Sequence, residues 1–353
     1  MTDWFAKNMM PIFFPYFIAF SIALISIILL KPLAMRLGLV DAPGGRKLHE
    51  GNIPLIGGIA MFLGFSFALL TLDVSLSTYR CLIAGSGLLV VTGLLDDFHE
   101  LTPRSRLFIQ IFVGILMVWW GNVSLESFGN LFSLGEIKSG FFAFPITVLA
   151  VVTIINAVNM TDGADGLAGS VAFVEFFYLA WLSHHAHLAV TGQLIYLVIT
   201  VLLAFLCFNF PWRQKPSVFM GDSGSMWLGF MLAWFCIELS QALHKAAEPV
   251  VFLYIMAIPL WDISSVIVRR LTRGFSPFKA DRGHLHHCLL EHGFSSLQVA
   301  VIISLLSAIL GLIGILGAKF NLSEMILFIT FIILFIFYLF VLHWAWRRLP
   351  SQK

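Results

Sequence analysis

Long apolar runs recur from one end of the chain to the other, separated by short polar segments. A helix that crosses a membrane needs roughly 20 predominantly apolar residues. Backbone amides in lipid must be hydrogen-bonded within their own segment, so each run is expected to be a helix. The pattern predicts an all-α polytopic membrane protein, a single membrane domain over residues 1–353, with about eleven spans: 11–31, 53–72, 79–95, 105–121, 141–158, 166–183, 189–208, 224–241, 248–268, 296–317 and 323–346.

The positions of Lys and Arg predict how these helices are oriented, because such residues gather in cytoplasmic loops. If the N-terminus lies outside, sixteen of the 21 Lys and Arg residues fall on the inner side and five on the outer side. We therefore predict an external N-terminus and a cytoplasmic C-terminus. The inner connections, which also hold most of the polar motifs, then lie near 41–58, 96–106, 159–170, 209–224 and 269–295.

Composition narrows the class of protein further. Only 11% of residues are charged and 59% are hydrophobic, whereas a soluble domain has about 25% charged residues. No basic block with interleaved aromatic residues indicates nucleic-acid binding. The four cysteines show no paired spacing, which argues against a disulfide framework or a four-thiolate metal site.

The first polar motif is Asp96-Asp97, where the third predicted helix reaches the cytoplasm. Adjacent residues on a helix point in different directions, so we expect the two carboxylates to have different roles. One role would be to bind a divalent cation and the other to accept a substrate proton. A solvated helix end is the simpler explanation of such a pair taken alone.

The second motif, NMTDGADGLAGS, spans 159–170. Asp162 and Asp165 are three residues apart, which would place them on one side of a helical turn. Gly163 and Gly166 would allow the backbone to approach a phosphate or a metal closely. Helix capping explains one acid but not two with a glycine beside each. A carboxylate at the bilayer centre costs about 2.5–3.5 kcal/mol, so acids near the hydrocarbon favour a functional role.

The third motif, FMGDSGSMWLG, opens the eighth predicted helix with Asp222. Taken alone, Asp222 is best explained as a helix cap. A helix N-terminus also attracts phosphate, however, and an acid there can hold a cation against it. The two interpretations are compatible.

The fourth motif lies in the basic inner loop at 276–294 and contains His284, His286 and His287. Cytoplasmic topology explains the arginines that precede it but not three histidines within four positions. Imidazole and guanidinium donors match the oxygens of a nucleotide diphosphate. A zinc site with Cys288 is the alternative, which we disfavour because consecutive residues cannot easily converge on one metal.

Together these motifs indicate a reaction class. Carboxylates at the inner face favour Mg²⁺ or Mn²⁺, which bind through one or two carboxylates plus substrate phosphates. The basic, histidine-rich loop indicates phosphates on a soluble substrate, and the position at the lipid boundary indicates a lipid as the second substrate. A metal ion with cationic groups around phosphates is typical of phosphoryl transfer.

Five motifs in this order resemble the polyprenyl-phosphate N-acetylhexosamine-1-phosphate transferases, over nearly the whole chain: VDAPGGRKLHEGNIPLIGGIAMF (40–62), LLDDFHEL, NMTDGADGLAG, MGDSGSMWLGF and SPFKADRGHLHH. The resemblance implies ten or eleven helical spans and a Mg²⁺ or Mn²⁺ cofactor. It further implies transfer of N-acetylglucosamine 1-phosphate from UDP-N-acetylglucosamine to undecaprenyl phosphate. This reaction is the first membrane step of O-antigen or other cell-surface polysaccharide synthesis in the bacterial inner membrane. A homodimer is compatible with the resemblance.

The resemblance also implies roles for individual residues. Asp96 and Asp97 match the acids assigned to metal and lipid phosphate, and Asp162 and Asp165 match the Asp-Gly-x-Asp-Gly acids. The implied catalytic residues are therefore Asp96, Asp97, Asp162 and Asp165, the implied metal ligands are Asp97, Asp222 and Asp162, and the implied substrate-binding residues are His284, His286, His287, Arg282, Asn159, Arg46, Lys47 and His49.

Several alternatives stay open at this point. Relatives that make O-antigen or teichoic acid share the pattern, so another UDP-N-acetylhexosamine could be the donor. The muramyl-pentapeptide relatives differ, because they carry consecutive histidines after a proline. A Mg²⁺-dependent membrane prenyltransferase would need spaced Asp-x-x-x-Asp acids, and a transporter would need polar groups at mid-bilayer. Two buried-looking acids remain unassigned: Asp262, which either pairs with a neighbouring helix or lines the site, and Glu175.

Overall fold

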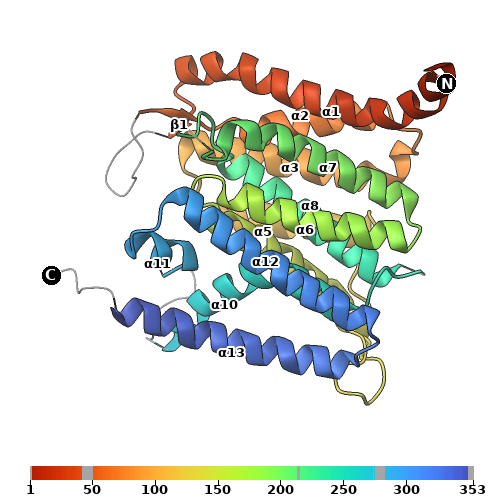
Figure 1. Cartoon of the computed structure of the whole chain (residues 1–353), viewed down its shortest axis with the longest axis vertical. Helices are drawn as coiled ribbons and strands as arrows, with labels where there is room; N and C mark the ends of the chain where they lie inside the picture. The colour runs from red at the N-terminus through yellow and green to blue at the C-terminus, as the bar shows by residue number, and fades with distance from the viewer. Residues whose placement is uncertain are drawn as a thin grey trace.

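The computed structural model describes residues 2–41, 51–212, 215–242, 244–272, 274 and 283–348, and of residues 2–12 the backbone alone. These residues form a bundle of helices that run alongside one another (Figure 1). The elements are α1 (Thr2–Leu37), β1 (Val40–Asp41), β2 (Ile53–Pro54), α2 (Gly57–Leu69), α3 (Leu76–His99), α4 (Pro103–Trp119), η1 (Gly140–Phe142), α5 (Ala143–Thr161), α6 (Leu167–His185), α7 (Ala189–Asn209), α8 (Gly221–Gln241), α9 (Pro249–Ile255), α10 (Ala257–Thr272), α11 (Leu285–Glu291), α12 (Ser296–Lys319) and α13 (Glu324–Arg348).

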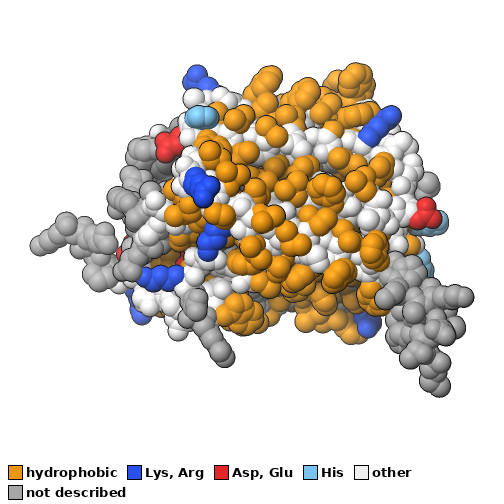
Figure 2. Space-filling view, turned by 90° about the horizontal axis from the view of Figure 1, so that it is seen from above, with side chains coloured by type: hydrophobic (Ala, Val, Ile, Leu, Met, Phe, Trp, Pro, Cys, Tyr) orange, Lys and Arg blue, Asp and Glu red, His pale blue; other side chains and the backbone are white. Residues whose placement is uncertain are grey.

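The bundle has the surface of a membrane protein. Seven helices in the described part of the chain are long and apolar enough to cross a bilayer, or eight if α9 and α10 together form one span. Figure 2 shows one face as a broad apolar band, with Lys and Arg side chains toward its two ends. Large side chains such as Phe17, Leu29 and Phe337 are more than half exposed, as expected where lipid replaces water. The predicted class, an all-α polytopic membrane protein, is confirmed.

Each predicted span overlaps a helix, but not every helix has the length of a full span. α2 has 13 residues and α4 has 17. α8 has 21 residues, yet it is not among the seven apolar helices. Nearly all of its side chains are buried against α2, α3, α5, α6 and α9. A helix enclosed by other helices does not face lipid, so it can carry serine, glycine and glutamate.

The predicted span 248–268 is wrong as a single helix. The chain breaks at Met256, and α9 and α10 meet at 80°. Pro259 lies in the first turn of α10, where its missing N–H is tolerated. Within one continuous helix the same proline would have lost a hydrogen bond and clashed with the preceding turn.

A small sheet, absent from the all-helical prediction, forms within the connection between α1 and α2, and an isolated bridge beside it reaches the segment before α8. Val40 pairs with Pro54 and Asp41 with Ile53, both antiparallel. Leu55 then forms a parallel bridge with Phe219, whose amide donates to the carbonyl of Pro54 at 2.9 Å. This pairing holds the start of α8 next to the start of α2, and it shortens the helix predicted over 53–72.

Glycines allow close contact between α8 and its neighbours. A Cβ added at Gly93 of α3 would overlap the backbone of Ser223, and one added at Gly58 of α2 would overlap the backbone of Gly224. The N-terminal turn of α8 is therefore held tightly between α2 and α3. Any side chain at these two positions would push α8 away from the acids at the end of α3.

We expect Gly93→Ala to destabilise the protein, because its methyl group meets backbone atoms that cannot rotate away; overpacking costs about 1–3 kcal/mol. Gly87→Ala, on the same helix, is the matched control. Its new Cβ would meet only Phe62, at 3.5 Å, and replacing a helical glycine contributes about 0.5–1 kcal/mol. Thermal unfolding in detergent should show a lower midpoint for Gly93→Ala and an unchanged or higher one for Gly87→Ala.

Candidate active site

The two adjacent acids at the end of α3 make different contacts. The carboxylate of Asp96 is buried and accepts hydrogen bonds from the amide of Leu101 at 2.6 Å and from Nη1 of Arg106 at 2.8 Å. Thr102 caps the following helix, α4, and accepts from the amide of Ser105. Asp96 therefore fixes the turn between α3 and α4 and holds Arg106, a residue that the sequence marked only as a loop charge.

Asp97 points instead at the N-terminus of α8. Its carboxylate accepts from the amide of Asp222 at 2.9 Å and from the amide of Ser223 at 3.4 Å. Gly221 begins α8 with φ +71°, and a Cβ there would lie 2.5 Å from Oδ2 of Asp97. An acid at this place satisfies free amides and is favoured by the helix dipole. The two carboxylates thus point to different partners, as the sequence predicted.

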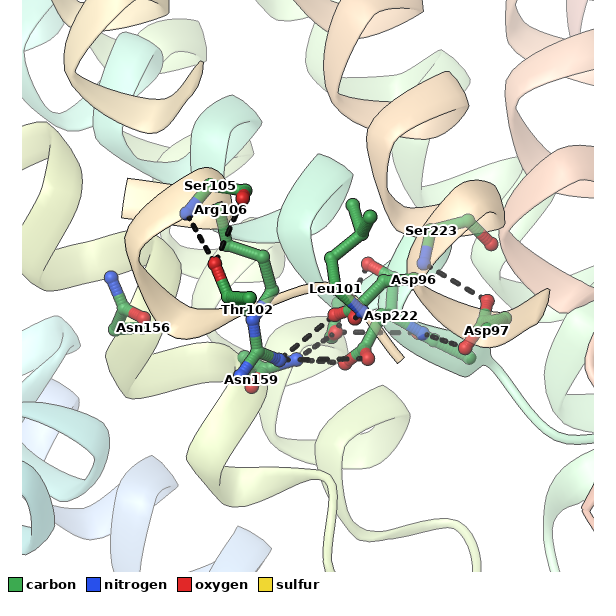
Figure 3. Close-up of polar contacts among 12 residues, drawn as sticks. Asp96, Asp97, Leu101, Thr102, Ser105, Arg106, Asn156, Asn159, Asp222 and Ser223 are labelled. Carbon is green, nitrogen blue, oxygen red and sulfur yellow. Dashed lines mark hydrogen bonds and ion pairs between the residues drawn. The ribbon is translucent and has the colours of Figure 1, made fainter. Parts of the chain in front are cut away.

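Polar side chains from two other helices reach the carboxylate of Asp222 (Figure 3). Nδ2 of Asn159, near the end of α5, donates to Oδ1 of Asp222 at 2.5 Å and to Oγ of Ser225 at 2.8 Å. Nη1 of Arg106 is 3.8 Å from Oδ2 of Asp222. Arg106 therefore bridges Asp96 and Asp222, and it connects the motifs of α3 and α8.

Asp162 and Asp165 lie in the loop between α5 and α6, not on one side of a helical turn as predicted. The helix ends at Thr161, and Gly166 adopts φ +73°, which the right-handed helix excludes. Asp162 is accessible to solvent although protein surrounds it. Desolvation raises the pKa of Asp162 to about 7, and the nearby charges of Asp222 and Asp165 raise it further. The acids of motifs two and three therefore act on one another.

The histidines meet this loop. His284 precedes α11, and His286 lies on it with its side chain buried. A Cβ added at Gly163 would overlap Nε2 of His286, so this ring rests directly on the loop beside Asp162. The rings of His286 and His287 are 4.2 Å apart between centroids. Desolvation, with the charge of His287, lowers the pKa of His286 to about 3, so this ring is neutral near pH 7.

The structure thus brings together most of the residues predicted for the site. Motifs from 96–97, 159–165, 222 and 284–287 converge at the end of the bundle where α3 ends and α8 begins. Four other predicted residues, Arg46, Lys47, His49 and Arg282, lie outside the described residues.

Asn209 is a residue that sequence reasoning missed. It is buried at the end of α7, where Oδ1 accepts from the amide of Gly166 at 3.0 Å and Nδ2 donates to the carbonyl of Val218 at 2.9 Å. It therefore ties the Asp162–Gly166 loop to the segment that leads into α8. A polar residue at the inner end of an apolar run was the only sequence signal for it.

The structure is thus a membrane helix bundle with acids and imidazoles clustered at one end. The model of the family described as glycosyl transferase family 4 matches residues 79–240. The chain is 36% identical over 296 residues to an undecaprenyl-phosphate alpha-N-acetylglucosaminyl 1-phosphate transferase of Yersinia pestis, covering 84% of this chain and 80% of that protein.

Proteins with the same description show similar agreement in other bacteria. The Haemophilus influenzae protein is 37% identical, with 83% of each chain covered. The Escherichia coli K12 protein is 34% identical, with 79% of this chain and 77% of the relative covered. The chain therefore belongs to the polyprenyl-phosphate N-acetylhexosamine-1-phosphate transferases, and it is a glycosyl-1-phosphate transferase. The resemblance seen in the motifs is confirmed.

We expect Asn209→Ala to lower activity as well as stability. The change leaves the amide of Gly166 and the carbonyl of Val218 without hydrogen-bond partners, and each unsatisfied buried group lowers the free energy of unfolding by about 1–3 kcal/mol. It also removes the hydrogen bond that holds the loop carrying Asp162. A small displacement at a reacting centre is expected to reduce kcat roughly tenfold or more.

Asn156→Ala is the matched control, because Asn156 donates to Oε1 of Gln110 and to a carbonyl of its own helix. Both variants should lose stability in thermal unfolding, and only Asn209→Ala should also lose kcat. Equal kcat values at a temperature where both are folded would contradict the role given to Asn209.

Proposed function

We propose that this protein transfers N-acetylglucosamine 1-phosphate from UDP-N-acetylglucosamine to undecaprenyl phosphate, giving undecaprenyl-diphosphate-N-acetylglucosamine and UMP. The observation that carries the proposal is the convergence of Asp97, Asp222 and Asp162 with the histidine helix at one end of a membrane bundle. The printed descriptions of the relatives support this donor and acceptor. The reaction would be the first membrane step in making O-antigen or a similar surface polysaccharide.

The proposal includes the placement of the enzyme in the membrane. Eleven spans with an external N-terminus would put the site on the cytoplasmic face of the bacterial inner membrane, where UDP-sugars are available. The excess of Lys and Arg in the loops at that side supports this orientation. α1 begins and α13 ends at opposite ends of the bundle (Figure 1), in keeping with termini on opposite sides. A homodimer stays part of the prediction, and its mass in detergent would test it.

In the proposed reaction, an oxygen of the lipid phosphate attacks the β-phosphorus of the UDP-sugar. The bond from that phosphorus to the bridging oxygen breaks, and UMP leaves with the electron pair. A phosphate monoester is mostly ionised at neutral pH, so its oxygen needs little help from a base. One diphosphate replaces another, and the reaction should therefore run readily in both directions.

The acids fit a divalent cation. Among the described residues, no three His, Cys, Asp or Glu side chains are grouped as a complete metal site. Mg²⁺, however, is usually held by one or two carboxylates together with substrate phosphates. Desolvation, and then the charges of Asp222 and Asp165, raise the pKa of Asp162, and a bound cation would offset the repulsion between these acids. Asp97, Asp222 and Asp162 are the candidate ligands, and one or two of them would hold Mg²⁺ or Mn²⁺ together with substrate phosphates; the ion would supply neutralisation of phosphate charge.

The remaining polar residues would bind and orient the substrates. Asn159 holds the carboxylate of Asp222 in place, and Arg106, through Asp96, brings a positive charge beside it. The histidines at 284–287 would contact the diphosphate of the UDP-sugar, because imidazole donors suit its oxygens. The loop acid Asp165 would complete the negative side of the site.

The activity itself can be tested with purified protein, undecaprenyl phosphate, Mg²⁺ and radiolabelled UDP-N-acetylglucosamine. We expect label in the lipid phase, release of UMP, and regeneration of the UDP-sugar when excess UMP is added. The kcat of Asp97→Asn should be at least about 100-fold lower, because the neutral amide lacks the negative charge with which the carboxylate would bind a cation and stabilise the N-terminus of α8.

Each other outcome of this assay is informative. Transfer only from another UDP-N-acetylhexosamine would keep the mechanism and change the donor. No transfer from any UDP-sugar, by protein shown to be folded, would contradict the proposed function and favour a membrane prenyltransferase.

The dependence on Mg²⁺ should itself depend on pH. Asp162 binds a cation as the carboxylate, and with a pKa of about 7 it must release a proton to do so at lower pH. The Mg²⁺ concentration for half-maximal activity should therefore fall as pH rises from about 6 to 8, by up to roughly tenfold per unit below the pKa. Titrations of MgCl₂ at several pH values measure it. The same half-maximal concentration throughout would rule out this role for Asp162.

A further inference from the structure

Asp262 makes three hydrogen bonds to residues around the histidine motif. Its Oδ2 is 2.7 Å from Nδ1 of His284, and its Oδ1 accepts from the amide of Leu285 at 2.9 Å and from the hydroxyl of Tyr338 at 3.1 Å. Asp262, His284 and Tyr338 are 5%, 6% and 8% exposed. The bent helix α10, the start of α11 and the last helix, α13, therefore meet at one buried carboxylate.

These contacts define the state of the His284 ring. A carboxylate only accepts hydrogen bonds, so Nδ1 of His284 must carry the hydrogen in the bond to Asp262. The other ring nitrogen, Nε2, has no hydrogen-bond partner among the described residues. Asp262 thus selects which nitrogen of His284 stays available, as carboxylates do for metal-bound and catalytic histidines.

The same carboxylate positions the rest of the motif. By accepting from the amide of Leu285, it fixes the first residue of α11, and His286 follows one position later. The ring of His286 rests on Gly163, in the loop that carries Asp162. A displacement of α11 would therefore move both histidines relative to the acids.

We propose that Asp262 is a positioning residue for the nucleotide-sugar site, which holds Nε2 of His284 toward the UDP-sugar, and that Tyr338 holds Asp262 in turn. The inference rests on the proposed function, since it takes the histidines to bind the UDP-sugar. It gives the last helix, α13, a part in the site that the motifs alone did not indicate.

Asp262→Asn is the most direct variant, because the geometry predicts how the amide turns. Oδ1 serves two donors, Leu285 and Tyr338, so the amide oxygen stays there and the NH₂ group faces His284. Nδ1 of His284 would then have to accept, and the hydrogen would move to Nε2. We expect KM for UDP-N-acetylglucosamine to rise roughly 10-fold or more, with little change in KM for undecaprenyl phosphate. Tyr338→Phe should show the same selectivity with a smaller rise.

Glu175→Gln is the matched control. Glu175 is also a buried acid within the bundle, and it takes no part in the proposed site. The acid-to-amide change there should leave both KM values unchanged. If Glu175→Gln raised KM for the UDP-sugar as much as Asp262→Asn does, the effect would be general destabilisation, and the inference would be wrong.

A double-mutant cycle separates positioning from a merely structural role. Once His284 is replaced by Ala, adding Asp262→Asn should change kcat/KM for the UDP-sugar by less than about twofold, because the two residues act as one unit. Fully additive losses would overturn the inference while leaving the proposed function intact, provided that the wild-type protein shows transfer.

A second measurement does not depend on the reaction. In protein labelled with ¹⁵N-histidine, the signals of His284, assigned by their loss in His284→Ala, should show the hydrogen on Nδ1 in the wild type and a changed state in Asp262→Asn. If the wild-type protein shows no transfer but its His284 signals show the hydrogen on Nδ1, the proposed function is contradicted and the Asp262–His284 contact is supported. An unchanged signature in Asp262→Asn would contradict the contact itself.

Discussion

The hydrogen bonds from the first amides of α8 to Asp97 join the two helices on which the site depends. α8 is enclosed by other helices, so its N-terminus has neither lipid-facing surface nor free access to water along its sides. Unpaired amides in such a place are costly. A carboxylate satisfies them and is stabilised by the helix dipole. The close approach needs glycine at 93 and 221, and it places Asp222 beside the end of α3.

Around this junction, opposite charges and amides compensate one another. Arg106 is shared between Asp96 and Asp222, and Asn159 supports Asp222 from the other side. The side chain of Asp162 forms no hydrogen bond with another described residue, and the charges of Asp222 and Asp165 lie near it. Of the five acids around the junction, Asp96 is paired with Arg106, Asp97 and Asp222 accept hydrogen bonds from neighbouring helices, and Asp162 and Asp165 come from the loop after α5.

The apolar runs predicted the long helices and their approximate bounds, because lipid leaves the backbone few alternatives, but they did not predict the short helix α11. The polar motifs at one predicted face were sufficient to predict which of them meet.

Other features depend on tertiary packing that no local pattern contains. Asn209 contacts Gly166 and Arg106 contacts Asp222, both far away in sequence, and the partners of Asp262 depend on how α10, α11 and α13 cross. Pro259 was a local sign of the 80° break between α9 and α10, but the prediction of one helix followed the length of the apolar run instead. The loop at Asp162 leaves the helical path because of its glycines, so a helical spacing argument failed there.

The three contacts of Asp262 divide the molecule into two parts with separate tasks. The acids come from residues 96–222, within the region that the family model matches, whereas the histidines are held by segments after residue 260. α10 packs on α5 and α12 packs on α6, and at the site itself His286 lies against Gly163. Under the proposed function, substitutions in the last third of the chain that move the histidines would weaken binding of the nucleotide sugar while the acids of residues 96–222 stay in place.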